Sequence, residues 1–113
     1  MTVTVKTLVA GTQLLPTAST YYTAGSNTKA IIHNATIYNT ASSNAVTATV
    51  HLVDTGASET SSNMIIGART ISPLETYKCP ELVGKTLSAT GTIRALASSS
   101  STLSFHVSGV EVT

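Results

Sequence analysis

The stretch VTATVHL, residues 46–52, decides the fold of this chain. Apolar residues alternate there with Thr and His, and a period of two is the pattern of a β-strand that buries one face. The residues predicted to face the core are Val46, Ala48, Val50 and Leu52, and those predicted to face outward are Thr47, Thr49 and His51. This segment is therefore predicted to be an extended strand with one buried face.

The same period recurs along most of the chain. It predicts further strands over residues 2–9, 28–39, 64–71, 76–79, 92–97 and 102–112. Turn-forming Gly, Pro, Asn and Ser separate these segments, and almost no stretch has the period of a helix. The sequence predicts an all-β fold, an antiparallel β-sandwich of about seven or eight strands. Jelly-roll, immunoglobulin-like and simpler connections all remain open.

Three local predictions depart from plain alternation. The polar stretch with Tyr21 and Tyr22 is predicted to be a loop, and Pro80 to Gly84 could form one helical turn. Gly109 is predicted to allow a bulge that re-aims Val110 and Val112. The predicted core residues are Val46, Val50, Leu52, Ile93, Leu103, Phe105 and Val107.

The length of 113 residues fits one domain, so residues 1–113 are predicted to form a single β-sandwich. Residues 1–15 stand out within it, because their Thr and Val alternation could add a strand to a neighbouring molecule. This segment is therefore a candidate strand-donating or interface arm.

Charged residues make up only 10% of the chain, whereas a free-standing soluble domain carries about a quarter. Thr, Ser and Asn occupy the outward positions in their place, and these side chains can be buried against protein at a lower desolvation cost. The net charge of +1 and the scattered Lys and Arg argue against nucleic-acid binding. No secretion signal or membrane-spanning run is visible, so we expect synthesis in the cytoplasm and no membrane partner.

Catalytic and metal-binding patterns are missing from the sequence. Asp54 is the only aspartate, and no motif ties it to a nucleophile. His51 and His106 both have outward parity, so a surface metal site is conceivable if their strands pair. Cys79, beside Pro80, is interpreted as a small structural residue. We expect a protein that is not an enzyme and needs no cofactor or metal.

The carboxyl-terminal half resembles small structural proteins of tailed bacteriophages. The resemblance spans roughly residues 30–112 and rests on the segments ARTISPLETY (68–77), PELVG (80–84), GTIRA (91–95) and VSGVE (107–111). It implies a β-sandwich module on a virus particle, with no catalytic residues to transfer. The chain departs from the pattern at Leu74, where relatives have glycine between the proline and the glutamate, and this departure leaves the turn type open.

Composition and resemblance together predict a virion structural protein. The main hypothesis is a capsid decoration or cement protein, made in the host cytoplasm, that binds the major capsid protein and its own copies as a homotrimer. The alternative is a neck- or tail-associated or receptor-binding (adhesin) module, which would bind a host-surface glycan through loops 16–27 and 54–63 with Tyr21, Tyr22 and Asn27 as contacts. The candidate interface residues are Val3, Val5, Leu8, Tyr21 and Tyr22.

Overall fold

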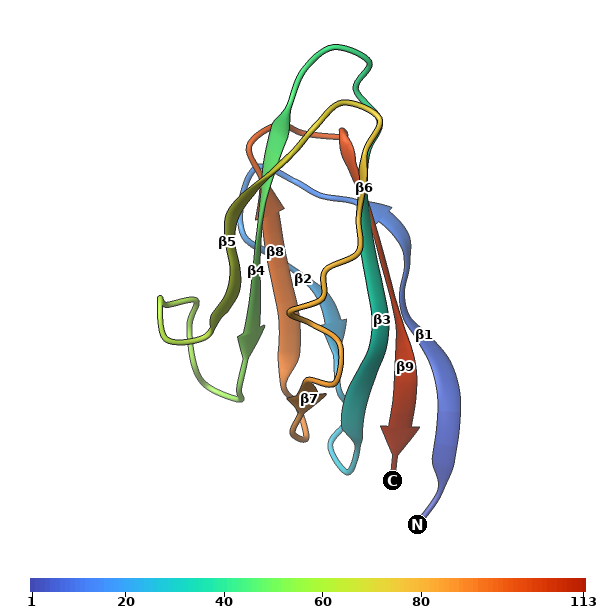
Figure 1. The fold of residues 1–113 in the computed structure, drawn as a ribbon. Helices are drawn as coiled ribbons and strands as arrows, with labels where there is room; N and C mark the ends of the chain where they lie inside the picture. The colour runs from blue at the N-terminus through green and yellow to red at the C-terminus, as the bar shows by residue number, and fades with distance from the viewer.

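The protein is built entirely from strands and turns. The computed structural model describes all 113 residues and contains no helix that could cross a membrane. Figure 1 shows two packed layers of strands, with both termini at the same end of the molecule. The strands are β1 (Val3–Gln13), β2 (Ser19–Thr23), β3 (Lys29–Asn39), β4 (Val46–Val53), β5 (Met64–Ile71), β6 (Thr76–Tyr77), β7 (Thr86–Leu87), β8 (Thr92–Ala97) and β9 (Leu103–Val112).

The pairing order identifies the fold as a jelly roll. One sheet, called here sheet A, has the order β1-β9-β3-β6, with β7 also paired to β3; the other, sheet B, has the order β2-β8-β4-β5. All pairings are antiparallel. β6 and β7 pair with the same edge of β3 and together take the place of one strand. The strand order is then that of two Greek keys folded into a double sheet. The predicted antiparallel β-sandwich is confirmed, and the connections that the sequence left open are those of a jelly roll.

The core lies between the two sheets and consists of the inward positions of the alternating strands. The predicted core residues are completely or almost completely buried except Leu52, which is half-buried near the end of β4. Phe105 is fully buried and meets the ring of Tyr21 edge to face, with centroids 6.1 Å apart. This contact joins β9 of sheet A to β2 of sheet B. Tyr21 and Tyr22 lie within β2, so the prediction of a loop at these residues was wrong.

β9 runs without an inserted residue from Leu103 to Val112, so the bulge predicted at Gly109 was wrong. The extra residues lie on its neighbours: β1 has Leu8 and a second residue between Val9 and Thr12 inserted, and β3 has His33 inserted. Gly109 serves a close approach instead, because a Cβ there would lie 2.0 Å from the Ile31 carbonyl oxygen. Since β9 keeps its parity, Val110 and Val112 share the outward side with His106.

The segment between β6 and β7 is a series of turns rather than the predicted strand end and helical turn. Leu82 N–H donates to the Cys79 carbonyl, and Lys85 N–H donates to the Leu82 carbonyl. Cys79 is buried in this coil, and burial is the main cause that raises the pKa of its thiol to about 12. A thiol that stays protonated matches the structural role predicted for Cys79.

The structure defines the type of the turn before β6, which the sequence left open. Leu74 has a φ of 58°, in the left-handed region that favours glycine, directly after Pro73. Glu75 N–H donates to the Ser72 carbonyl at 3.1 Å, and the Glu75 carboxylate accepts from Ser72 N–H at 2.8 Å. A positive φ at the residue after proline is the geometry of a type II turn, so Leu74 occupies a position that favours glycine.

Candidate interaction surface

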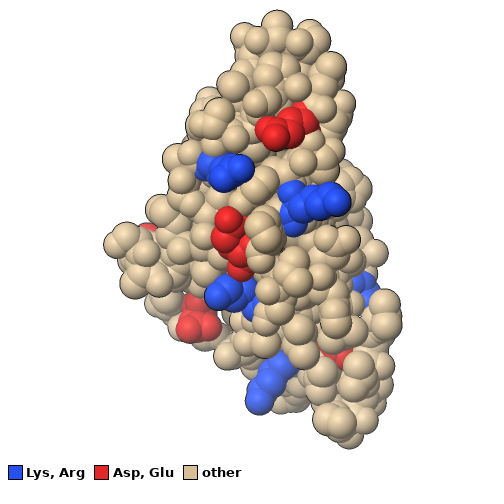
Figure 2. All heavy atoms as spheres, viewed as in Figure 1, with Lys and Arg blue, Asp and Glu red and all other residues tan.

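The outer face of sheet A carries few charged side chains. The register stacks the outward residues of β1, β9 and β3 in cross-strand rows, and Lys29 is the only Lys, Arg, Asp or Glu among them. On the side viewed in Figure 1, Figure 2 shows acidic and basic groups close to one another, with uncharged atoms over most of the surface. Covering a surface of this kind with another protein costs little desolvation free energy.

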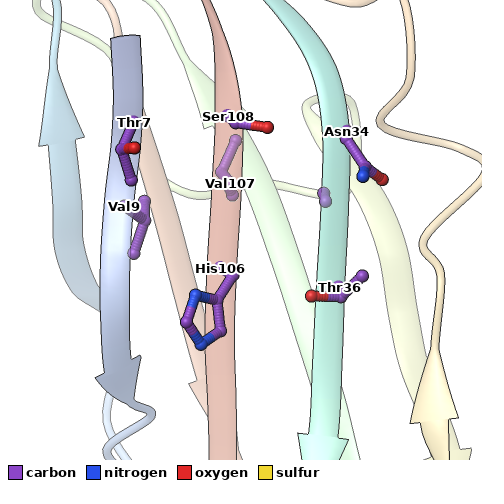
Figure 3. Close-up of a pocket in the computed structure, with 8 residues that line it drawn as sticks. Thr7, Val9, Asn34, Thr36, His106, Val107 and Ser108 are labelled. Carbon is purple, nitrogen blue, oxygen red and sulfur yellow. The ribbon is translucent and has the colours of Figure 1, made fainter.

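The middle of this face is shallow and polar. A hollow of about 190 Å³ lies over β1, β9 and β3, and Figure 3 shows His106 and Ser108 between Thr7 on one side and Asn34 and Thr36 on the other. These side chains can donate and accept hydrogen bonds, and none carries a permanent charge. The hollow therefore suits contact with a polar protein surface better than recognition of a charged ligand.

The end of the same face near the termini is apolar. Val3 is 58% exposed and Val5 is 85% exposed, although both lie within a strand. The register places Val5 beside Val110, and Val110 beside Ile31. Val3 lies beside Val112 in the next row. These five residues, called here the valine strip, are Val3, Val5, Ile31, Val110 and Val112.

Only part of the predicted interface set lies on this surface. Val3 and Val5 do, but Leu8 and Tyr22 are buried, with 6% and 8% of their surface exposed. Tyr21 is half-buried against the core, and its hydroxyl accepts a hydrogen bond from Leu15 N–H at 2.9 Å. Leu8 turns inward because it is the inserted residue of β1, and Val9 beside it is buried too. The sequence prediction did not include Val110 and Val112 as surface residues. The available signal was their even numbering, because the predicted core residues Leu103, Phe105 and Val107 are odd-numbered and so face the other side of the same strand.

The amino-terminal segment is not a free arm in this structure. β1 pairs with β9 along its length, and Thr2 and Thr113 exchange two backbone hydrogen bonds of 2.9 Å beyond the strand ends. Its other side has no partner, because β1 is the outermost strand of sheet A. Figure 1 shows this free edge running along one side of the molecule, away from sheet B.

Two charges near the valine strip, those of Lys6 and Glu111, pair with each other. Glu111 accepts a hydrogen bond from the Tyr22 hydroxyl, and its carboxylate lies 3.4 Å from the Lys6 ammonium. The bond from Tyr22 is the main cause that lowers the pKa of Glu111, and burial is the main cause that raises the pKa of Tyr22. The group ties β1 and β9 to β2 of the other sheet, and Lys29 beside Val112 is the charged side chain that borders the strip.

The histidines do not form a metal site. His51 lies on β4 of sheet B and His106 on β9 of sheet A, so the pairing that a shared surface site required does not exist. His51 is 5% exposed, and its Nδ1 lies 2.8 Å from Asn63 Oδ1. No group of three His, Cys, Asp or Glu side chains is arranged to hold a metal ion.

Loop 54–63 folds back onto sheet B, so it differs from an open ligand loop. Glu59 accepts a hydrogen bond from Arg94 at 3.0 Å, and Thr55 donates to the Ala89 carbonyl at 3.0 Å. Within the other predicted loop, 16–27, Asn27 is exposed but Tyr21 and Tyr22 are engaged inside the sandwich. The aromatic side chains expected to contact a glycan are therefore not available on either loop.

A further aromatic group closes the open side of the sandwich beside β3. Arg69 on β5 lies 4.5 Å from the centroid of the Tyr77 ring on β6. The Tyr77 hydroxyl donates to Glu81 at 2.5 Å and 2.7 Å to the two oxygens. Burial is the main cause that raises the pKa of Tyr77 to about 12. The cluster joins the two sheets and has the character of a structural contact.

Comparison with known proteins does not identify a family for this chain. No family model matches the chain, and no curated protein is similar to it in sequence. Among solved structures, one described as "Structure of infectious bursal disease virus Gx strain" is similar with a TM-score of 0.44 and 12% identity. The match covers 97% of this chain and 32% of that one, so this chain spans about a third of its length. Values this low carry no argument about function.

Proposed function

We propose that this protein is a virion structural protein that acts as a decoration or cement protein of a tailed bacteriophage. In this proposal it is made in the host cytoplasm, docks on the assembled shell through the major capsid protein and contacts its own copies, with a trimer as the natural assembly on a threefold position. Repetition over many sites would let a modest interface on each copy stabilise the whole particle.

The observation that carries the proposal is the outer face of sheet A. It combines a single charged side chain, Lys29, with two strongly exposed valines and a polar hollow. A monomer gains nothing from exposing Val5 at 85%, whereas a surface that meets protein in its working state gains buried apolar area. The jelly roll is compatible with this role, since viral capsid domains use it, but lectins and cupins use it as well.

Binding to shells that lack the protein tests the proposal. Purified protein should bind such shells and raise their thermal stability. Ser108→Lys places a charge in the middle of the outer face and should weaken binding by more than about tenfold, because an unpaired charge would be desolvated. Thr70→Lys, on an exposed position of β5 in the other sheet, is the matched control and should bind normally. If the protein does not bind, and shells without it are equally stable to heat, the proposal fails.

A neck- or tail-associated or receptor-binding module remains the alternative role. It required a ligand site in loops 16–27 and 54–63, and the contacts described above occupy Tyr21, Tyr22 and much of loop 54–63. Copy number separates the two roles: hundreds of copies in a particle favour decoration, and about a dozen favour the neck or tail. Binding to a glycan array would support the receptor-binding role instead.

A further inference from the structure

The free edge of β1 differs from the other sheet edges of the molecule. β5 is irregular, with register shifts and a positive φ of 48° at Ala68, and β2 is short and also shifted. On the remaining edge, β6 and β7 have two residues each. Val3 to Thr7 is instead a regular five-residue run with no proline and no bulge, and its one charged side chain, Lys6, is paired with Glu111 of its own chain. Natural sheets normally protect such an edge, so an unprotected one indicates a strand partner.

The register identifies which backbone groups of this run are free. Thr2 and Thr113 form a reciprocal hydrogen-bonded pair, and such pairs alternate along an antiparallel ladder. Thr4 and Lys6 therefore bond toward β9, while Val3, Val5 and Thr7 point their N–H and C=O groups away from the molecule. These three residues present six unpaired backbone groups in one line.

We propose that β1 pairs antiparallel with β1 of a second copy about a two-fold axis through Val5, which joins the two A sheets edge to edge. In this register Val5 faces Val5 of the second copy, and Val3 faces Thr7. All six free backbone groups on each copy then find partners. The inference goes beyond the proposed function, because it concerns the isolated protein in solution and needs no capsid.

Side chains select this register over its neighbours. Moving the pairing by two residues in one direction would set Lys6 opposite Lys6 of the second copy, and like charges directly opposite destabilise a strand pair. Moving it the other way would set Thr7 opposite Met1, which lies outside β1. In the proposed register Lys6 faces Thr4, and the Lys6 ammonium keeps its pair with Glu111 inside its own chain.

The same register explains the exposure of the valine strip. The row that contains Ile31, Val110 and Val5 continues directly into the equivalent row of the second copy. Val5 is 85% exposed in the monomer and lies at the centre of the joined surface. Pairing therefore supplies hydrogen bonds along the edge and apolar contact across it, which is the combination that strand addition uses.

Sedimentation equilibrium on the purified chain tests the association. We expect the wild-type protein to dimerise reversibly at high micromolar concentration. Val5→Lys should raise the Kd by more than about tenfold, because it sets two ammonium groups opposite each other, and Val5→Glu should do the same. Val83→Lys is the matched control, because Val83 is also an exposed valine, 50% accessible, but lies in the turn between β6 and β7. It should dimerise like the wild type.

Mixing the two charged variants tests whether the residues at position 5 face each other. An equimolar mixture of the Val5→Lys and Val5→Glu chains should form heterodimers, while each chain alone stays monomeric. Both substitutions lie at a solvent-exposed position, so far-ultraviolet circular dichroism should be unchanged. A wild-type chain that stays monomeric, a Val5→Lys chain that still dimerises, or a mixture without heterodimers overturns the proposal.

Disulfide formation tests the register. Val5→Cys places two thiols across the axis, at the separation of about 5.5 Å between Cα atoms that a disulfide accepts. Val3→Cys places its thiol opposite Thr7 of the second copy, so it should cross-link at least about tenfold more slowly. The native Cys79 is buried and does not compete. Equal rates for the two variants overturn the register.

Discussion

Asn39 fixes two turns at the end of the sandwich through one buried amide. It is completely buried at the end of β3, and its Nδ2 donates to the Ile71 carbonyl at 2.9 Å and to the Asn44 carbonyl at 3.0 Å. Its Oδ1 accepts from Ala41 N–H at 2.9 Å. The side chain thus joins the turn after β3 to the end of β5, which belongs to the other sheet.

Asn39→Ala should destabilise the protein by about 3 kcal/mol, because it leaves buried backbone groups without partners. Chemical denaturation measures the loss. Asn44→Ala is the control, since Asn44 is exposed and contributes only its backbone carbonyl to this network, and it should change stability by less than about 0.5 kcal/mol. Equal effects of the two substitutions would contradict the role of the buried amide.

Leu74 is a second residue whose backbone conformation matters more than its side chain. It has a φ of 58° and is 57% exposed, so it bears left-handed strain and gains little burial. Leu74→Gly should stabilise the fold by about 0.5–1 kcal/mol, since relief of strain exceeds the added freedom of the unfolded chain. A rise of a few degrees in Tm would be the readout. Leu15→Gly, at an exposed leucine with negative φ, should not raise Tm.

At the scale of an element, β9 holds sheet A together because it pairs with β1 on one side and β3 on the other. The inserted residues lie on its neighbours, which lets β9 keep a continuous alternation. Gly109 makes this possible on the β3 side, where the Ile31 carbonyl lies in the space that a side chain would occupy. The strand thus depends on one glycine for close backbone contact.

Gly109→Ala should destabilise the protein by about 3 kcal/mol, because a Cβ would lie 2.0 Å from a backbone oxygen in the middle of the sheet. The free energy of unfolding from urea titration checks this. Gly67→Ala is the matched control: its Cβ would meet only the Met64 sulfur, at 3.0 Å, and that flexible side chain can move aside. A tolerated Gly109→Ala substitution would mean that β9 and β3 are farther apart than the structure has them.

At the scale of the whole molecule, Glu111 ties the two sheets together near the termini. Its carboxylate accepts from Tyr22 of sheet B and pairs with Lys6 of sheet A, and its pKa is lowered below the usual 4.5. A lowered pKa in the folded state means that the unfolded state binds the proton more readily. The contribution of Glu111 is therefore present above about pH 4.5 and is lost as the pH falls through its folded-state pKa.

Glu111→Gln should consequently be less stable than the wild type at pH 7, and the difference should shrink at pH 3. Urea midpoints at the two pH values measure it. Tyr22→Phe removes the main cause of the lowered pKa of Glu111. In a Tyr22→Phe background, the loss of stability caused by Glu111→Gln should therefore vary less with pH. A difference between wild type and Glu111→Gln that stays constant from pH 7 to pH 3 would show that ionisation of Glu111 does not contribute.

Alternation and turn residues alone determined most of the fold. Residues 46–52, 64–71 and 92–97 were predicted as strands and are strands, because a period of two is a local property that each segment carries by itself. β2 and β7 were missed, since their few residues are held in place by β8 and β3 rather than by their own pattern. Of the predicted interface residues, Val3 and Val5 are exposed, whereas Leu8 and Tyr22 are buried.

What the sequence by itself determined is a low-charge, antiparallel β-sandwich with Thr, Ser and Asn on its outward positions, because composition and period are properties of the order of residues. Only the tertiary structure decided the jelly-roll connections, the inward turn of Leu8, the outward parity of Val110 and Val112, and the free edge of β1. The physical reason is that an inserted residue reverses the facing of everything after it on that strand, and which strand takes the insertion depends on its neighbours.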